Sequence, residues 1–443
     1  MSFPKDFIWG TATSSYQIEG GGLEYGRGVS IWDTFSKTPG KVHNGDTGEV
    51  ACDHVHRYGQ DVGLLRDLGV DSYRFSVAWG RILPDGTGTV NPQGLDFYNR
   101  LVDELLDSGI KPFLTLYHWD LPQALQDRGG WENPDSVQWF VDYSAIVSEA
   151  LGDRVKDWIT HNEPYVVSML GNQLGLHAPG KTDSQAAYTV AHHLLISHGE
   201  AVPAIRANSA DAEVGITLDQ TYSYPLSGSW EDRQAARLFD AYHNEWFLEP
   251  VFRGSYPADL VRLLEPQGIL DRINLDDIQK AKVPTDFLGI NYYTRSVVSA
   301  NGNNPALPIH FNRVEGTEHT GMGWEVYPQG LLHTLIYLHN AYYPNKIYIT
   351  ENGCAYDDPE PQDGMVNDPE REAYYRKHID AVEQALDLGV SVAGYFAWSL
   401  LDNFEWAYGY DKRFGLYHVD FETQARTMKR SAAYYRDRIK QSR

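Results

Sequence analysis

Cysteine is nearly absent from this sequence, which contains only Cys52 and Cys354 among its 443 residues. A disulfide framework and a four-cysteine zinc site both need more cysteines, so the sequence excludes both kinds of scaffold. A reducing compartment fits this composition best.

Long apolar runs are also missing, since the sequence has no stretch of about 18 apolar residues that could cross a membrane as a helix. The first ten residues, MSFPKDFIWG, place Pro4, Lys5 and Asp6 where a secretory signal needs an uninterrupted apolar segment. We therefore expect a cytoplasmic protein without a membrane partner.

Basic residues are few, because Lys and Arg total 37 against 60 Asp and Glu, which gives a formal net charge of -23. This charge repels phosphate-rich surfaces, so nucleic acid and anionic membranes are disfavoured as partners. Hydrophobic residues, at 42%, are sufficient for a folded core. The 12 Trp, 29 Tyr and 16 Phe suit neutral, hydroxyl-rich ligands with apolar C–H faces, although aromatic rings also fill cores.

No low-complexity tract or Gly/Ser linker divides the chain, so we expect residues 1–443 to form a single domain. One unit recurs, in which an amphipathic helical segment ends at a glycine and a short apolar run follows. In the clearest copies Gly69, Gly109 and Gly389 stand where a left-handed residue would cap the helix.

Eight apolar runs are interpreted as strands, centred near Ile8, Phe75, Leu114, Trp158, Ile216, Leu288, Ile347 and Tyr395. Predicted helices separate most of them, including 136–151, 185–207, 232–247 and 328–342. Eight strands alternating with helices are typical of a (β/α)8 TIM barrel, an α/β fold with its active site at the carboxyl ends of the strands. A doubly wound open sheet is disfavoured, because no G-x-G-x-x-G or G-x-x-x-x-G-K-[ST] loop follows an early strand. Long irregular stretches are expected to shape a site at the barrel mouth, at 20–57, 298–327 and 353–370.

Two glutamates come at the ends of apolar strands, Glu163 in WITHNEP and Glu351 in IYITENG. Pro164 and Gly353 interrupt each strand directly afterwards. Either glutamate alone could cap a helix or pair with an arginine. Together, two strand-end carboxylates are the minimal apparatus for glycoside hydrolysis, in which one donates a proton and the other attacks or activates water.

Motifs along the whole chain carry a resemblance to a known family. They are FIWGTATSSYQIEG, SIWDTF, YRFSVAW, YHWDLP, the TxNEP of residues 160–164, the ITENG of residues 349–353, and WSLLDNFEW. In this order and spacing, from Phe7 to beyond Trp406, the sequence resembles glycoside hydrolase family 1, the retaining β-glucosidases.

The resemblance implies roles for the residues around the two carboxylates. Glu163 would be the acid/base and Glu351 the nucleophile, held at the retaining separation of roughly 5 to 5.5 Å. Tyr293 and Asn291 would lie near Glu351, with Tyr293 orienting it by a hydrogen bond, and Arg74 would help to keep Glu351 ionised. No cofactor and no metal is implied.

The resemblance also implies a sugar-binding set. The residues expected to hold the glycone are Gln17, His118, Asn162, Trp398, Glu405 and Trp406. Asn162 would contact the 2-hydroxyl, and the charge of Glu405 disfavours a 6-phosphorylated substrate. Trp324 would form the aglycone platform, whereas Asp219 stands where many relatives have Asn, which leaves the leaving-group preference open.

Other residues are assigned ordinary structural roles. Trp9, Trp32 and Trp79 are expected in the core, and Cys354 as a small buried hydrophobe. The pair His54 and His56 resembles the H-x-H of metal-dependent barrels but lacks a preceding apolar strand, so a metal role is disfavoured. The helical histidines are interpreted in the same way, at positions His192, His193 and His198.

The sequence therefore predicts an enzyme that hydrolyses terminal β-D-glucosyl residues of small β-glucosides and cello-oligosaccharides with retention of configuration. Transglycosylation, in which a second sugar replaces water, would use the same residues. A non-catalytic sugar-binding barrel is the alternative from another class, and it would not need both glutamates. The choice between glucose, fucose and galactose and the oligomeric state remain open.

Overall fold

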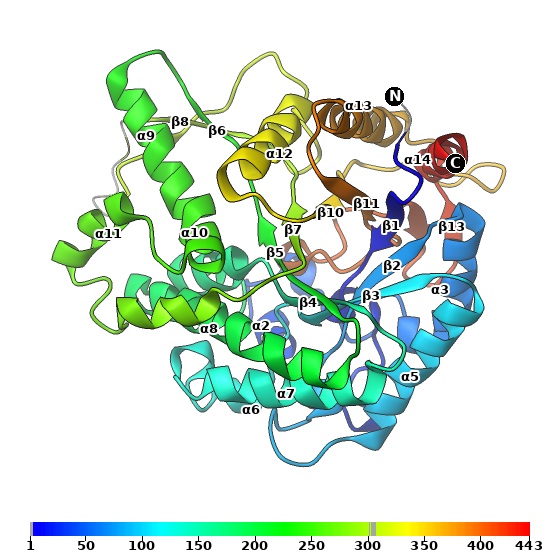
Figure 1. Cartoon of the computed structure of the whole chain (residues 1–443). Coiled ribbons are helices and arrows are strands. Elements are labelled where there is room, and N and C mark those ends of the chain that lie inside the picture. The colour runs from blue at the N-terminus through cyan, green and yellow to red at the C-terminus, as the bar shows by residue number, and fades with distance from the viewer. Residues whose placement is uncertain (1–2, 301, 303–306) are drawn as a thin grey trace.

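Eight parallel strands form a closed barrel in the computed structural model, which describes residues 3–300, 302 and 307–443 (Figure 1). Around the barrel the order is β1-β11-β10-β7-β5-β4-β3-β2. The strands are β1 Ile8–Ala12, β2 Ser72–Ser76, β3 Lys111–Tyr117, β4 Asp157–Asn162, β5 Glu213–Asp219, β7 Phe287–Asn291, β10 Ile347–Asn352 and β11 Val392–Trp398. Each predicted apolar run coincides with one of them, so the predicted TIM barrel is confirmed.

Helices surround the barrel in Figure 1. The longer ones are α3 His54–Leu68, α5 Pro92–Asp107, α7 Ser136–Leu151, α8 Ser184–Asn208, α9 Trp230–Asp240, α10 Trp246–Arg253, α12 Pro328–Tyr342, α13 Pro369–Asp387 and α14 Arg430–Ser442. The shorter ones are α1 Ser15–Ile18, α2 Ile31–Ser36, α4 Trp79–Ile82, α6 Gln123–Gln126 and α11 Ala258–Leu264. The predicted helices 136–151 and 328–342 are confirmed to the residue, whereas the predicted helix 232–247 is divided between α9, a π-helical turn at Ala241–Glu245 and α10.

The glycine caps hold the helix-to-strand turns. Gly69, Gly109 and Gly389 have φ of 73°, 71° and 84°, in the left-handed region where a side chain would be strained. The predicted caps are therefore confirmed, and each turn leads into the next barrel strand.

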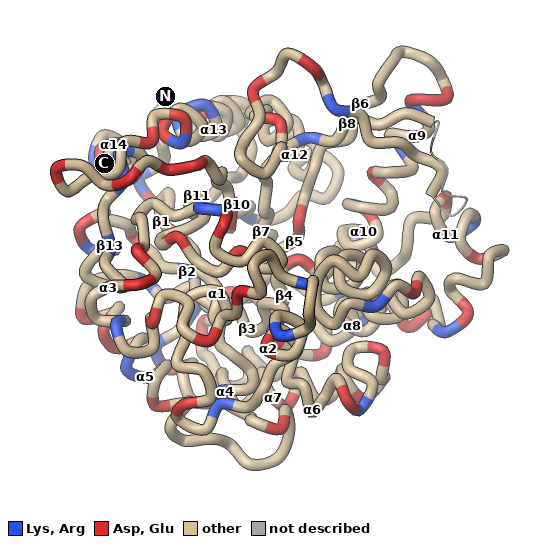
Figure 2. The backbone as a smooth tube through the Cα atoms, turned by 180° about the vertical axis from the view of Figure 1, so that it is seen from behind, with Lys and Arg blue, Asp and Glu red and all other residues tan. Residues whose placement is uncertain are grey.

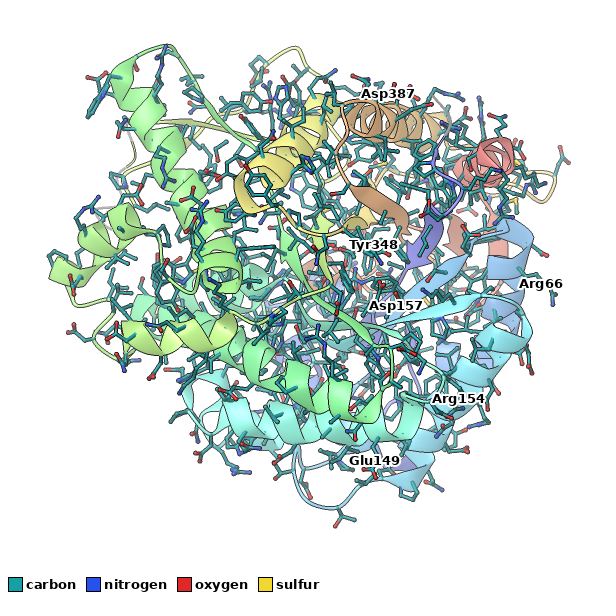
Figure 3. All side chains as sticks on the ribbon, in the orientation of Figure 1. Arg66, Glu149, Arg154, Asp157, Tyr348 and Asp387 are labelled. Atoms are coloured by element: carbon teal, nitrogen blue, oxygen red, sulfur yellow. The ribbon has the colours of Figure 1, made fainter. Side chains whose placement is uncertain are left out.

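Aromatic rings close the interior of the barrel. Phe113, Phe287, Tyr348 and Phe396 pack with ring centroids 5.1 to 5.3 Å apart in several edge-on contacts. A Cβ at Gly10 would lie 2.3 Å from the ring of Phe396, so glycine makes room for this layer. Tyr348 lies over the middle of the barrel in Figure 3, whereas Arg66, Glu149 and Asp387 lie on the outer helices.

Smaller sheets lie outside the barrel. One contains β6 Ser223–Pro225, β8 Ser296–Ser299 and β9 His310–Phe311, and the other contains β12 Tyr417–Val419 and β13 Arg426–Met428. The predicted loop 20–57 contains α2, whose Trp32 packs 4.6 Å from the Trp406 ring, and 298–327 brings Met322 and Trp324 to the cavity described below. Positions 301 and 303–306 of that loop lie outside the described residues.

Charge is dispersed over the surface. In Figure 2 the Lys and Arg positions are scattered among Asp and Glu positions rather than gathered on one face of the view. Within the described part of the chain, no helix combines the length and apolarity that crossing a membrane requires. Trp9, Trp32 and Trp79 are buried, as predicted.

A buried ion cluster ties the loop 353–370 to the segment after β11. Lys429 donates to Asp402 over 2.6 Å and also to Asp358, and Asp402 in turn accepts from Arg413 over 2.7 Å. Arg371 bridges Asp358 over 2.8 Å and the backbone carbonyl of Arg413 over 2.8 Å. The segment held by this cluster, 399–415, is also the one that carries the residues of the WSLLDNFEW motif.

We predict that Lys429→Met lowers the free energy of unfolding by about 3 kcal/mol, because two buried carboxylates lose a shared counterion. Urea unfolding measures this. Lys377→Met is the matched control, since Lys377 pairs with Glu318 at the exposed surface and a change of less than about 1 kcal/mol is expected. Equal effects of the two substitutions would contradict a stabilising role for the cluster.

Candidate active site

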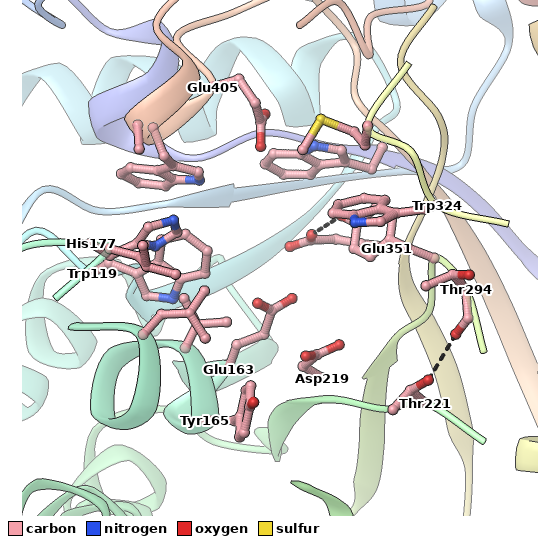
Figure 4. Close-up of a pocket in the computed structure, with 18 of the residues that line it drawn as sticks. Trp119, Glu163, Tyr165, His177, Asp219, Thr221, Thr294, Trp324, Glu351 and Glu405 are labelled. Carbon is pink, nitrogen blue, oxygen red and sulfur yellow. Dashed lines mark hydrogen bonds between the residues drawn. The ribbon is translucent and has the colours of Figure 1, made fainter. Parts of the chain in front are cut away.

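Glu163 and Glu351 face one cavity at the carboxyl ends of the strands (Figure 4). Glu163 directly follows β4 with φ of 48°, and its N–H donates to the carbonyl of Thr217 in β5 over 2.9 Å. Glu351 is the next-to-last residue of β10. Gly353 follows the strand, and a Cβ added at Gly353 would lie 1.9 Å from the carbonyl oxygen of Trp398. The cavity has a volume of about 430 Å³. The two carboxylates, distant in sequence, are thus brought into one space.

The predicted sugar-binding residues fall into two layers. Those that line the cavity with the two glutamates are His118, Tyr293, Trp324, Trp398, Glu405 and Trp406. Those that lie behind them and contact them are Gln17, Arg74, Asn162 and Asn291, each fully or almost fully buried. The second layer fixes the first, as its hydrogen bonds show.

Arg74 and Tyr293 hold the carboxylate of Glu351. Arg74 Nη1 donates to Glu351 Oε1 over 2.6 Å, and the Tyr293 hydroxyl donates to Oε2 over 2.5 Å. Burial raises the pKa of Glu351, and these two partners act in the opposite direction, favouring the ionised form. Both contacts have the form that the sequence predicts.

Glu163 is held differently, because Asn291 Nδ2 donates to its Oε1. Asn291 also lies near Glu351, as the resemblance implies, because the two residues are paired across β7 and β10, and its amide donates to Asn162 over 3.0 Å. Burial raises the pKa of Glu163 well above its usual value, and the negative charges of Asp219 and Glu351 raise it further. Arg74 thus favours the charged form of Glu351, while burial and the neighbouring carboxylates favour the protonated form of Glu163.

Asn162 connects both halves of this network. Its Oδ1 accepts from Arg74 Nη2 over 2.6 Å as well as from Asn291, and its Nδ2 lies 3.1 Å from His118 Nε2. Burial lowers the pKa of His118 well below its usual value, so its ring is neutral. A neutral ring can accept a hydrogen bond from Asn162 at Nε2 and donate at Nδ1.

Flat rings form the walls of the cavity. The His118 ring is stacked 6.0 Å from both Trp398 and Trp406, and Trp119 lies 4.5 Å from Trp406. On another wall, Trp324 lies 5.3 Å from the Tyr293 ring. Such faces suit the apolar C–H surfaces of a sugar ring, while the carboxylates accept from its hydroxyls.

Sequence reasoning did not single out several residues of the cavity. Trp119 belongs to the quoted motif YHWDLP, and its φ of 79° is, with those of Glu163 and Trp406, one of three left-handed non-glycine conformations in the lining. His177, His243 and Thr221 come from loops and turns without a local pattern to indicate them. Strained backbone at a cavity is typical of functional sites.

The histidines that were disfavoured as metal ligands have other partners. His54 Nδ1 lies 2.8 Å from Asp61, His198 Nδ1 2.8 Å from the Thr160 hydroxyl, and His192 Nδ1 2.9 Å from the Tyr256 hydroxyl. Among the residues described, no group of three or more His, Cys, Asp and Glu side chains is arranged to hold a metal ion. Cys354 is buried with Tyr374 and Val326, as expected of a small hydrophobe.

The buried carboxyl group of Glu405 makes the stability of the folded protein depend on pH, and this dependence can be measured. Burial, then the charge of Glu351, raises its pKa to about 8, and the hydrogen bond from Gln17 only partly offsets this. Between an ordinary value of 4.5 and about 8 the folded protein binds a proton that the unfolded chain has lost, so stability falls as pH rises through this window.

We therefore predict that Glu405→Gln raises the melting temperature by about 1 to 3 °C at pH 8 and leaves it unchanged near pH 5. Thermal unfolding at the two pH values measures the difference. Exposed Glu422→Gln serves as the control for loss of one charge. A gain of the same size at both pH values would refute the titration argument.

Comparison with known proteins agrees with this geometry. The sequence model of Glycosyl hydrolase family 1 matches residues 1–443. The chain is 47% identical to Beta-glucosidase A of Acetivibrio thermocellus over 445 residues, which cover 99% of this chain and 98% of that protein. It is 48% identical to the 1,4-beta-D-glucan glucohydrolase of Thermotoga neapolitana over 439 residues, covering 99% and 98%.

Solved structures give the same result. The Thermotoga maritima family 1 glycoside hydrolase complexed with a cyclophellitol analogue transition-state mimic superposes with a TM-score of 0.96 at 47% identity. The match covers 100% of this chain and 98% of that one. With its barrel, its two strand-end glutamates and these relatives, the chain belongs to glycosyl hydrolase family 1.

Proposed function

We propose that this protein is a retaining β-glucosidase that removes terminal β-D-glucosyl residues by double displacement. The observation that carries the proposal is the unequal setting of two glutamates facing one cavity, because Arg74 and Tyr293 donate to Glu351, whereas burial and neighbouring carboxylates raise the pKa of Glu163. The named activities of the relatives in the same family support it. A non-catalytic sugar-binding barrel would not need this difference between the two carboxyl groups.

In the first step Glu351 attacks the anomeric carbon, and Glu163 gives its proton to the departing glycosidic oxygen. The leaving group departs as a neutral alcohol, and Glu351 becomes an ester of the sugar. Esterification removes the charge of Glu351, which lowers the pKa of Glu163. In the second step ionised Glu163 takes a proton from water, the water oxygen attacks the same carbon, and Glu351 leaves as the carboxylate.

The residues around the pair suit a neutral glucoside. Gln17 Nε2 lies 3.4 Å from Glu405 Oε2 and orients this carboxylate toward hydroxyls of the bound sugar, while Trp398 and Trp406 offer flat faces. Asn162 is placed between Arg74 and His118, from which we infer that it contacts the 2-hydroxyl, where contacts strengthen in the transition state. Trp324 would support the leaving group, and small β-glucosides and cello-oligosaccharides are the substrates we infer. A cytoplasmic location is part of the proposal, and it suits two buried cysteines without disulfide partners.

We predict that Glu351→Gly loses hydrolysis of an aryl β-glucoside by about 10⁴-fold or more, because no nucleophile remains. Azide enters the vacated space and attacks from the nucleophile's side, so added azide restores turnover and the product is the α-glucosyl azide. Product configuration by NMR is the measurement. Full hydrolytic activity in this variant would refute the assignment of Glu351.

We predict that Glu163→Ala slows release of a poor leaving group by about 10²- to 10⁴-fold and leaves glycosylation by a dinitrophenyl glucoside nearly unchanged, since only the poor leaving group needs a proton. Azide then attacks the glucosyl-enzyme from the opposite side and gives the β-glucosyl azide. The two glutamate variants thus control for each other. Equal slowing for both leaving groups would contradict the acid role.

A further inference from the structure

Asp219 is a carboxylate in the cavity that neither step above uses. It is the last residue of β5 and lines the same cavity as Glu163, and Figure 4 shows the two side chains beside each other. The strands are adjacent, because Asn162 of β4 pairs with Thr217 of β5 and the Glu163 N–H bonds to the Thr217 carbonyl. Asp219 therefore lies on the neighbouring strand β5, one residue closer to the barrel mouth than Glu163.

The ring of His243 lies close to the carboxylate of Asp219. Its Nε2 lies 3.1 Å from Asp219 Oδ2, and its buried ring is packed 4.0 Å from Tyr165 and 5.2 Å from Phe239. The backbone beside Asp219 is fixed, because Gln220 N–H donates to the Asn291 carbonyl over 3.0 Å.

The charges around this pair come from several elements. Titratable or charged groups from several elements face Glu163 and Asp219. They belong to β2, β10, the π-helical turn after α9 and the segments that follow β3, β4, β7 and β11. The groups are Arg74, His118, Tyr165, His177, His243, Tyr293, Glu351 and Glu405. Asp240 lies on the other side of His243. Arg74 donates to Glu351 and Asn162, and its charge lowers the pKa of Glu163, opposing the effects of Asp219 and Glu351.

We propose that Asp219 is a positioning residue that sets the proton affinity of Glu163 through both steps of the reaction. This inference rests on the proposed retaining mechanism. The charge of Glu351 is present in the first step and absent in the second, because the sugar ester is neutral. The charge of Asp219 is present in both, so it keeps Glu163 protonated in the first step and keeps it a competent base in the second.

The contributions to the pKa of Glu163 agree with this arrangement. Burial is the largest contribution, and the charge of Asp219 comes next, ahead of that of Glu351. Esterification of Glu351 therefore removes the smaller of the two charge effects.

Asp219→Asn and Asp219→Ala test the inference, with Asp219→Glu as the matched variant that keeps the charge. For both neutral variants we expect the alkaline limb of kcat/KM, which reports loss of the Glu163 proton, to move down by about half a pH unit or more. The acid limb of kcat, measured with a dinitrophenyl glucoside so that deglycosylation limits turnover, should move down as well, with about a two- to fivefold lower plateau. Asp219→Glu should keep both limbs within about 0.2 unit of the parent protein.

A role confined to packing or to binding the leaving group would change KM or the plateau without moving both limbs in the same direction. Unmoved limbs in both neutral variants, or limbs moved toward higher pH, would overturn the inference. Melting temperatures establish that each variant is folded, and Asp219→Asn, which keeps the shape of the side chain, serves if the alanine variant is unstable. Absence of hydrolysis by the parent protein would instead refute the proposed function, so the two failures are distinguishable.

Discussion

The buried contact between Arg74 and Glu351 is the interaction on which the rest of the site depends. Four carboxylates face the cavity, those of Glu163, Asp219, Glu351 and Glu405, and none of the described lining residues is Lys or Arg. Arg74 approaches from behind and directs its charge to Glu351 and, through Asn162, toward His118. Among the four carboxylates, Glu351 is the one to which Arg74 donates a hydrogen bond in the described structure, and this contact favours its ionised form.

The barrel brings the four carboxylates together, and it also buries them, which disfavours their ionised forms. Aromatic rings fill its interior, so the cavity is open only toward the loops, and water cannot hydrate the carboxylates from below. Burial accordingly contributes most to the raised pKa of Glu163 and of Glu405. Glu163, Trp119 and Trp406 also hold left-handed backbone conformations. The ion cluster around Lys429 holds the segment that bears Glu405 and Trp406, and thus stabilises the fold next to the cavity.

Much of this could be predicted from the sequence, because barrel strands and catalytic glutamates leave local patterns. Apolar runs indicated all eight strands, and Pro164 and Gly353 indicated that Glu163 and Glu351 come at strand ends. Hydrogen-bond partners leave no such pattern: Asn291 lies beside Glu351 as expected, but its hydrogen bond to Glu163 was not foreseen.

His243 was missed for a related reason. The sequence 232–247 reads as one continuous helix, but the π-helical turn at Ala241–Glu245 re-aims the side chains that follow α9. A change in turn type has no strong signature in residue preferences, and its effect appears only where the helix packs against β5. The domain assignment and the roles of the site residues remain predictions.

The same electrostatics accounts for the class of substrate. An anionic ligand would add charge to a cavity that already holds four acidic groups, and a 6-phosphate would lie against Glu405. A cation would neutralise Glu351 and abolish the difference between nucleophile and acid. A neutral sugar would avoid both outcomes, because its hydroxyls could donate to the carboxylates and its C–H faces could cover the rings of Trp398 and Trp406, as we propose. Hydrogen bonds from a neutral sugar would favour the ionised form of the carboxylates that accept them. The sugar would add no charge beside Glu163 and Glu351.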